Sequence, residues 1–579
     1  MLIHRIAAQL YTAEALQDID AALMAGEDAT LAISQSGRTL AVAAQFARRP
    51  RPTVYIVSGE DAADRAARSI AAYVGADRVV RFPERKDYPW KNAEPDDAVV
   101  AARCAALARI ARGDACIMVA SARSLLRCVP PLESRYWASR TYSVGEEVAF
   151  EEVPGQLVSM GYTRADAADA PGLFRVLGDT VDIWAAQATA PVRIEFFGDE
   201  IDRIRLMVAS TGQTIGDEDS VEISPVRELA LTDEAVRRIS AALYLPAQDD
   251  TELAALLELV EARVVTPELE RFLPLLYGET VSPLAHVHPN ALVILSEPRS
   301  LFDDCSRAYE DLERRASDAK IARLDGLYVR PQELDFGRQQ RLNYVSLIRA
   351  GGSVTAELKI EQPALAGSDN RFMSRIQEVV NNRFACVFAI PDRGARESME
   401  LSFTDENIPF EESLQAAPEN AGAVGGARVR VELLKRDVDA LNARGIDEGG
   451  ERVVPTLTRG RMTFVDAPIP SGVVVPAAHL AVFSLADLNA RMDGKRGART
   501  GAWTSPRSPS PSSRVTTWFT ARTALPCSPR SSARRSPARS ATTSCWNTRG
   551  ATSSTSRSSR STASRATSAP TATIPVSRV

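Results

Sequence analysis

In the first 130 residues, short apolar runs rich in Val, Ile and Ala alternate with segments that carry apolar residues at helical spacing. Buried strands are predicted at 29–33, 53–57, 78–82 and 115–120, and helices at 40–47, 62–74 and 122–128. Alternation of this kind builds a parallel sheet with helices on both faces. The chain is therefore predicted to open with an α/β domain.

Between residues 131 and 225 the hydrophobic period changes to two. Apolar and polar residues alternate over 141–148, 173–184 and 192–197, and Gly178-Asp179 is a hairpin signal between two of these runs. We expect a small antiparallel β domain inserted into the α/β unit.

After the insertion, helical patterns dominate residues 226–335, and Leu253, Leu256, Leu257 and Val260 form a stripe predicted to be core. From 336 the α/β character returns. Strands are predicted at 385–390, 428–433, 462–465 and 480–483, and helices at 373–380 and 438–443. The predicted class is a multidomain α/β protein with domains at 1–130, 131–225, 226–335, which completes the first, and 336–495, followed by a disordered tail at 496–579.

The tail differs sharply in composition from the rest. From residue 501 onward there are 12 Arg but no Lys, Asp or Glu, and about 40% of residues are Ser or Thr, a composition that cannot bury a core. Of the 69 basic and 74 acidic side chains in the whole chain, the first 500 residues hold 57 and 74. Because this body is acidic, tight non-specific duplex binding by it is not expected.

Several classes of protein are disfavoured by simpler observations. No apolar run is long enough to span a membrane, and Glu14, Asp18 and Asp20 do not fit a secretion signal, so a cytoplasmic protein is expected. The seven cysteines form no C-x-x-C pair, which predicts reduced thiols. His286 and His288 have no neighbouring ligand types, so we expect a polar loop and no metal site.

The segment at 29–47 has the strand–loop–helix form of a nucleotide-binding loop, whose working motif is G-x-x-x-x-G-K-[ST]. In that register the chain has Ala32, Gly37, Arg38 and Thr39. A Cβ at Ala32 crowds the anion site, and Arg38 does not replace the phosphate-binding Lys. We also find no acidic stretch after a later strand to hold Mg²⁺. The loop is predicted to be a structural relic, with residual nucleotide binding as the alternative.

These residues, together with several later segments, resemble the family of bacterial transcription-repair coupling factors over about residues 1–495. The inserted sheet resembles the module that this family shares with the B subunit of the bacterial excision nuclease (UvrB). The resemblance is carried by Phe82-Pro83, Tyr88-Pro89-Trp90, Gly172–Ile183, Pro191–Asp202, Thr211-Gly212-Gln213 and Gly472–Leu488.

The resemblance implies that the inserted module binds the A subunit of the excision nuclease (UvrA) through Arg175, Arg193, Glu195 and Phe197. Arg and Glu form charge-assisted pairs, and an exposed aromatic supplies an anchor. The family usually has Arg two residues after the position of Arg175, where this chain has Leu177. The alternative is that Arg193 and Glu195 are solvated strand residues and Phe197 belongs to the core.

In the intact family, contacts with RNA polymerase and DNA, and the use of ATP and Mg, belong to further domains that are not readable here. The tail suggests why these further domains are not readable in the sequence. Val515–Thr520 can be encoded by codons that, read one nucleotide earlier, give Gly-Asp-Tyr-Val-Val-His, and other parts of the tail similarly give strings resembling the family's polymerase-binding domain. We hypothesise a one-nucleotide slip near Thr500. A genuine Arg-rich nucleic-acid arm is the competing interpretation.

The leading hypothesis for function is therefore a non-catalytic fragment of a coupling factor that recruits UvrA, with no cofactor of its own. Two alternatives stay open. The chain could be an ATP-dependent helicase-type repair enzyme, which DNA-stimulated ATP turnover would reveal. It could instead bind nucleic acid through its Arg-rich tail, which salt-dependent binding lost on deleting 501–579 would reveal.

Overall fold

The computed structural model describes residues 2–485 and residue 487, apart from 92–95, 135–137, 186–187, 189, 320–323, 336–338, 347–353, 364–368 and 415–456. The predicted strand at 428–433, the predicted helix at 438–443 and the tail from 501 onward lie outside the described residues. Among the helices that are described, none combines the length and the apolar character needed to cross a bilayer.

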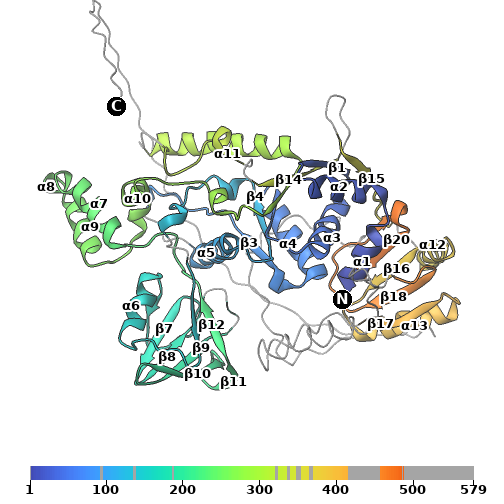
Figure 1. Cartoon of the computed structure of the whole chain (residues 1–579), viewed down its shortest axis with the longest axis horizontal. Helices are drawn as coiled ribbons and strands as arrows, with labels where there is room; N and C mark the ends of the chain where they lie inside the picture. Colours follow the sequence, from blue (N-terminus) through green and yellow to red (C-terminus); the bar gives the residue numbers. More distant parts are fainter. Residues whose placement is uncertain are drawn as a thin grey trace, which may run out of the picture. The chain divides into compact units, whose positions relative to one another are not determined.

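A parallel sheet of seven strands forms the centre of the first domain, in the order β15-β1-β14-β13-β2-β4-β3 (Figure 1). Its strands are β1 (Ala29–Ile33), β2 (Thr53–Val57), β3 (Val79–Phe82), β4 (Ile117–Ser121), β13 (Leu292–Ser296), β14 (Gln340–Val345) and β15 (Ala356–Leu358). The predicted parallel sheet is confirmed. β1 and β2 have the predicted bounds, and β3 and β4 differ from them by one or two residues.

Helices cover both faces of this sheet, because successive residues of a strand point to opposite sides. Tyr55 and Val57 of β2 belong to one core, whereas Val54 and Ile56 belong to another. The first core includes α1 (Leu2–Leu10), α2 (Glu14–Met24), α3 (Arg38–Arg48) and α4 (Glu60–Val74). The second includes α5 (Asp97–Arg112), α7 (Asp233–Leu243), α9 (Thr251–Glu261), α10 (Leu273–Tyr277) and α11 (Pro298–Asp318).

The first sheet continues past residue 336, where the sequence analysis placed the start of the third domain. β14 and β15 lie on either side of β1, with Ala29 opposite Leu342 and Leu31 opposite Ala356. Without them β1 would leave backbone donors and acceptors unpaired at both edges. The domain division at 336 therefore does not coincide with the end of the sheet.

The predicted helix at 122–128 is wrong. The structure has a single 3-10 turn, Arg123–Leu125, and the chain then runs extended. Arg127 and Val129 form isolated bridges with Tyr328 and Val281, so their backbone groups pair with distant segments. Tertiary pairing has overridden the local helical pattern.

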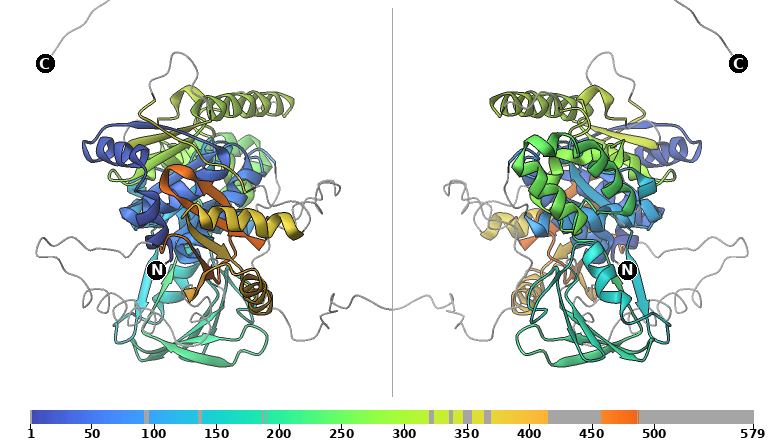
Figure 2. Two further views of the ribbon diagram at one scale, coloured as in Figure 1. Left: turned by 90° about the vertical axis from the view of Figure 1, so that its right-hand side faces the viewer. Right: turned by 90° about the vertical axis from the view of Figure 1, so that its left-hand side faces the viewer.

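The inserted module contains a six-stranded sheet in the order β11-β10-β9-β8-β7-β6, antiparallel except for β6 and β7, and Figure 2 shows these strands side by side. Its strands are β6 (Thr163–Arg164), β7 (Leu173–Leu177), β8 (Thr180–Ile183), β9 (Val192–Phe197), β10 (Glu200–Met207) and β11 (Thr214–Glu218). β5 (Arg140–Ser143) and β12 (Ser220–Ile223) pair separately, and α6 (Glu152–Ser159) lies between β5 and β6 in the chain. The predicted hairpin at Gly178-Asp179 is confirmed, since Leu177 pairs with Thr180.

The third sheet has five strands in the order β17-β18-β16-β20-β19, parallel except for β19 and β20. Its elements are α12 (Asp369–Asn381), β16 (Ala385–Ala389), α13 (Arg393–Asp405), β17 (Phe410–Leu414), β18 (Arg461–Val465), β19 (Val473–Val475) and β20 (Leu480–Ser484). The predicted strands at 385–390, 462–465 and 480–483 and the predicted helix at 373–380 are confirmed.

Residues 226–335 are mainly helical, as predicted, but they also supply β13 to the middle of the first sheet. Leu256 and Val260 of α9 are buried, and Leu253 and Leu257 pack against the same core, so the predicted stripe is confirmed. A short helix, α8 (Pro246–Asp249), precedes α9. His286 is buried and lies 2.9 Å from the carbonyl oxygen of Pro130.

Buried ion pairs connect the segment that follows the inserted module to the first domain. Glu228, five residues after β12, lies 2.9 Å from Arg85 Nη1 and 2.5 Å from Arg103 Nε, and all three side chains are at most 5% exposed. Asp87, Arg127 and Glu270 extend the cluster. Since buried charges are stable only when they are paired, each member depends on its neighbours.

The five cysteines of the described region are free and buried. Burial raises the pKa of the Cys128 and Cys305 thiols to about 12, which keeps both protonated near neutral pH.

Candidate functional site

The outward face of the six-stranded sheet brings together the four side chains that the sequence analysis assigned to partner binding. Arg175 lies on β7, and Arg193, Glu195 and Phe197 follow one another at every second position of β9. Residues two apart in a strand share a face, and the intervening Ile194 is buried in the core of the module. We call this surface the docking face. The role of its residues in binding stays a prediction.

Asp182 of β8 lies between two arginines of the docking face. It is opposite Arg175 on one side and Arg193 on the other. Arg175 Nη2 donates to Asp182 Oδ2 at 2.6 Å, and Arg193 Nε donates to Oδ1 at 2.6 Å. The hydrogen bond to Asp182 raises the pKa of Arg193. Asp182 was not predicted as a site residue, although its place in the alternating pattern put it on this face.

Glu195 is also paired, with Arg205 of β10, which donates to it through Nη2. Arg205 Nη1 donates to Thr214 Oγ1 at 3.3 Å. Arg193 and Glu195 are therefore not freely solvated strand residues, because each is engaged in an ion pair whose partners are only 2–27% exposed. Fixed, partly shielded charges of this kind favour directional contacts with another molecule.

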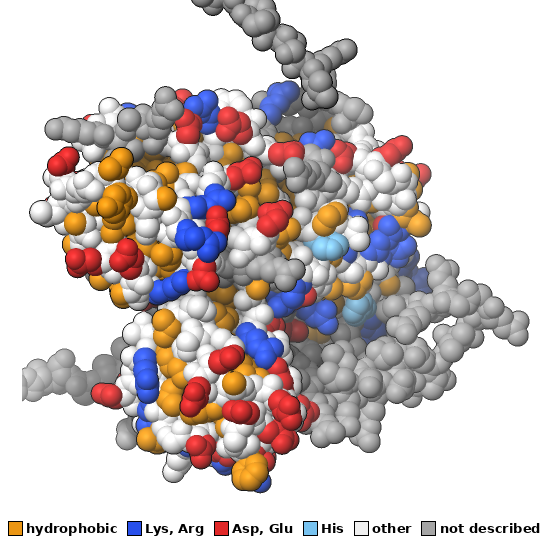
Figure 3. All heavy atoms as spheres, turned by 60° about the vertical axis from the view of Figure 1, so that its left-hand side comes forward, with side chains coloured by type: hydrophobic (Ala, Val, Ile, Leu, Met, Phe, Trp, Pro, Cys, Tyr) orange, Lys and Arg blue, Asp and Glu red, His pale blue; other side chains and the backbone are white. Residues whose placement is uncertain are grey.

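Phe197 is not part of the core. It is 81% exposed, whereas the preceding Phe196 is 6% exposed and packs edge-on against Phe150 with ring centroids 5.1 Å apart. Leu177 is also exposed, at 59%. Figure 3 shows hydrophobic, acidic and basic side chains intermixed on the surface of the module, in the lower part of the view. Large exposed apolar side chains among charges are typical of protein-binding surfaces.

The nucleotide-like loop has the predicted strand–loop–helix form. Ala32 lies in β1 and is 5% exposed, and Gly37 ends a 3-10 turn after which Arg38 and Thr39 open α3. In a working loop the hydroxyl at the position of Thr39 would bind Mg²⁺. Here Ser69 of α4 donates a hydrogen bond to Thr39 Oγ1 at 2.9 Å.

Arg38 is held within the protein. Its side chain is 3% exposed, and it donates to Ser296 Oγ and Ser346 Oγ at 2.7 Å each and pairs with Glu297. A lysine at this position of a working loop reaches phosphate oxygens. Arg38 instead donates hydrogen bonds to Ser296 and Ser346, which lie at the ends of β13 and β14.

Glu297 is a carboxylate that the sequence analysis missed. It directly follows β13, where a working site would carry the Mg²⁺-binding acid, and it has a positive φ of 58°. Burial would raise its pKa, but hydrogen bonds from Ser346 and Arg38 outweigh burial and lower it. One acid after a buried strand gives no recognisable motif, so only the fold reveals its position beside Arg38.

Ile360 fills the space against the loop. A Cβ added to Gly37 would lie 2.1 Å from Ile360 Cδ1, and Ser34 Oγ donates to the carbonyl oxygen of Ile360 at 3.0 Å. Ile360 is 8% exposed and belongs to the core that joins the first and third sheets. The space beside the loop glycine is therefore filled by the chain's own residues.

We predict that ATP with Mg²⁺ leaves the melting temperature of the protein unchanged, because Arg38 and Ile360 occupy the loop. A ligand that binds only the folded state at 100 times its Kd stabilises it by about 2.7 kcal/mol. Differential scanning fluorimetry with millimolar ATP, against a matched salt control, measures this. A melting temperature that rises by several degrees with ATP and Mg²⁺, but not with the salt control, would contradict the conclusion that the chain's own residues fill the loop.

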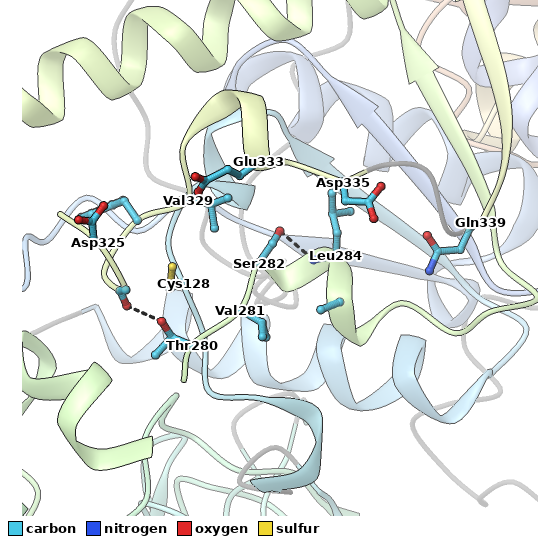
Figure 4. Close-up of a pocket in the computed structure, with 13 residues that line it drawn as sticks. Cys128, Thr280, Val281, Ser282, Leu284, Asp325, Val329, Glu333, Asp335 and Gln339 are labelled. Atoms are coloured by element: carbon cyan, nitrogen blue, oxygen red, sulfur yellow. Dashed lines mark hydrogen bonds between the residues drawn. The ribbon is translucent and has the colours of Figure 1, made fainter. Parts of the chain in front are cut away.

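A separate pocket of about 320 Å³ lies in the first domain (Figure 4). Its lining includes Asp325, Glu333 and Asp335, and Thr280 donates to the Gly326 carbonyl at 2.8 Å at its edge. Because three carboxylates repel phosphate groups, the lining of this pocket is not complementary to a nucleotide's phosphates. No group of metal-ligand side chains is found in the part of the chain that the structure describes.

Comparison with known proteins identifies the inserted module. Residues 141–229 match the model of the UvrB interaction domain. The chain is 26% identical to the transcription-repair-coupling factor of Mycobacterium tuberculosis over 494 residues, 82% of this chain and 38% of that protein. For the factor of Myxococcus xanthus the identity is 26% over 427 residues, 67% of this chain and 35% of that protein.

A third relative shares a shorter stretch. The UvrABC system protein B of Thermotoga neapolitana is 29% identical over 221 residues, 36% of this chain and 33% of that protein. The matches therefore span about a third of each relative's length. Over about the N-terminal 80% of its residues, the chain is a distant homologue of transcription-repair-coupling factors and contains a UvrB interaction domain.

Proposed function

We propose that this chain recruits UvrA, the A subunit of the bacterial excision nuclease, through the docking face. The observation that carries the proposal is Phe197, which is 81% exposed within a domain that matches the UvrB interaction domain model. It stands on the same strand face as Arg193 and Glu195, whose charges are paired. An exposed aromatic surrounded by fixed charges has the chemistry of a binding anchor.

The nucleotide-like loop is filled by the chain's own residues, and this limits the activity that we expect of the region that recruits UvrA. Because Arg38 is paired with Glu297 and Ile360 lies against Gly37, we propose that residues 1–497 bind a partner without turning over ATP. In a complete coupling factor, we assign ATP, Mg²⁺, DNA and RNA polymerase to regions beyond the matched third. By the similarity to coupling factors, recruitment would link stalled transcription to excision repair.

A pull-down with purified UvrA tests the proposal. We expect the intact chain to retain UvrA, and Arg193→Ala and Phe197→Ala to retain less of it. Phe197 is exposed, so its replacement should leave the circular dichroism spectrum unchanged, and the same measurement checks that Arg193→Ala, which removes one partner of the buried Asp182, remains folded. Failure of the unchanged chain to retain UvrA, or full retention by both variants, would reject the proposal.

We also propose that residues 501–579 are translated from a shifted reading frame. The support is compositional, since 12 Arg and no Lys, Asp or Glu are what shifted codons for a charged β-rich domain would give. Resequencing the gene around codon 500 is expected to reveal one inserted or missing nucleotide. A tail that resembles the coupling-factor family in none of its three frames would contradict this.

A further inference from the structure

The carboxylate of Asp182 is almost completely buried although it points to the outward face of the sheet. Its side chain is 2% exposed, and those of Arg175 and Arg193 are 28% and 22% exposed. Asp182 Oδ2 accepts from Arg175 Nη2 at 2.6 Å and from Arg193 Nη2 at 3.0 Å, and its Oδ1 accepts from Arg193 Nε at 2.6 Å. The two arginines from neighbouring strands therefore cover one acid.

This arrangement leaves part of each guanidinium available. Arg175 and Arg193 both use Nε and Nη2 to bind Asp182. Within the described residues, no acceptor is found for Nη1 of either arginine. Since one carboxylate balances only one of two positive charges, the group carries a net charge of about +1 and can donate to an oxygen of another molecule.

A surface arginine normally samples many rotamers, and ordering it on binding costs about 0.5–1.5 kcal/mol. Here the fork-shaped contacts with Asp182 hold both side chains before any partner arrives. Burying the acid is unfavourable unless both arginines remain paired with it. The three residues therefore behave as one preorganised unit.

We infer that Asp182 is a positioning residue of the docking face, which holds Arg175 and Arg193 in the orientation that the partner meets. This inference rests on the proposed recruitment of UvrA. Asp182 itself does not touch the partner, because the two arginines cover it. Its contribution is transmitted only through them.

A double-mutant cycle with purified UvrA tests this role by isothermal titration calorimetry. Asp182→Asn is expected to weaken binding about tenfold, because two side chains must then be ordered on association. In the Arg175→Ala, Arg193→Ala background, Asp182→Asn should have no further effect. Asp61→Asn is the matched control, since Asp61 is an exposed acid on α4, outside the inserted module, and it should bind as the unchanged chain does.

A second variant covers the case in which Asp182→Asn does not fold. Arg175→Lys with Arg193→Lys keeps both charges and Asp182 but loses the planar fork, so it should also bind about tenfold more weakly. The inference would be overturned if Asp182→Asn and the arginine substitutions had independent effects on affinity, or if the double lysine variant bound with unchanged affinity. Either result would leave the proposed function standing. No binding by the unchanged chain would overturn both this inference and the proposed function.

Discussion

Phe197→Ala is expected to weaken binding of UvrA about 30- to 1,000-fold. Central aromatic anchors typically contribute about 2–4 kcal/mol to an interface when truncated to alanine, which corresponds to that range of Kd. Phe197 is 81% exposed in the free chain, so its removal costs the fold little packing while it removes a large apolar surface that a partner could bury. The loss should therefore appear in affinity and not in stability.

Surface plasmon resonance with immobilised UvrA measures this change, and Tyr244→Ala provides a matched control. Tyr244 is an aromatic side chain that is 64% exposed at the end of α7, outside the inserted module. Its replacement should leave the Kd unchanged. A Phe197→Ala variant that binds within twofold of the unchanged chain, or an equal loss with Tyr244→Ala, would show that the docking face is misassigned.

Glu228→Gln is expected to destabilise the fold by about 3–5 kcal/mol, because removing one charge of a buried pair leaves its partners uncompensated. Glu228 is paired with Arg85 and Arg103, and neither arginine is more than 1% exposed. Urea denaturation followed by circular dichroism measures the change. Glu234→Gln is the control, because Glu234 is exposed and its ion pairs within the described residues are with Arg237 and Arg238 on its own helix, so no measurable change is expected.

The same cluster predicts a dependence on pH. Burial opposes ionisation of Glu228 and Asp87, but the neighbouring arginines outweigh it and lower the pKa of both carboxyls. A lowered pKa in the folded state adds stability above the pKa of the unfolded chain, about 4.3 for Glu. That stability is lost as the pH falls through the lower pKa of the folded state. As the pH falls below 5, the free energy of unfolding of Glu228→Gln should therefore decrease less than that of the unchanged chain. An identical decrease in the two proteins would contradict this.

Features that depend on local sequence were predictable. β1, β2 and β9 have the predicted bounds because five or six alternating or β-branched residues, bounded by turn residues, specify a strand locally. The register of the hairpin at Gly178-Asp179 followed from its turn residues. The alternating pattern of β9 also placed Arg193, Glu195 and Phe197 on one face.

Features that depend on contacts between distant residues were not predictable. β14 and β15 join β1 from more than 300 residues away, so the sheet passes the expected domain division at 336. The pairing of Arg38 with Glu297 and the placement of Ile360 at Gly37 arise from the same crossovers. Asp182 was not predicted for a related reason. Its role depends on the two arginines that pair with it, and these come from the two neighbouring strands.

The most direct test is one calorimetric series on the same preparation of the intact chain, titrated first with ATP and Mg²⁺ and then with UvrA. We expect no heat of binding for ATP and a saturable heat for UvrA that Phe197→Ala largely removes. Saturable ATP binding would contradict the conclusion that the chain's own residues fill the nucleotide-like loop, and no interaction with UvrA would contradict the docking role of the inserted module.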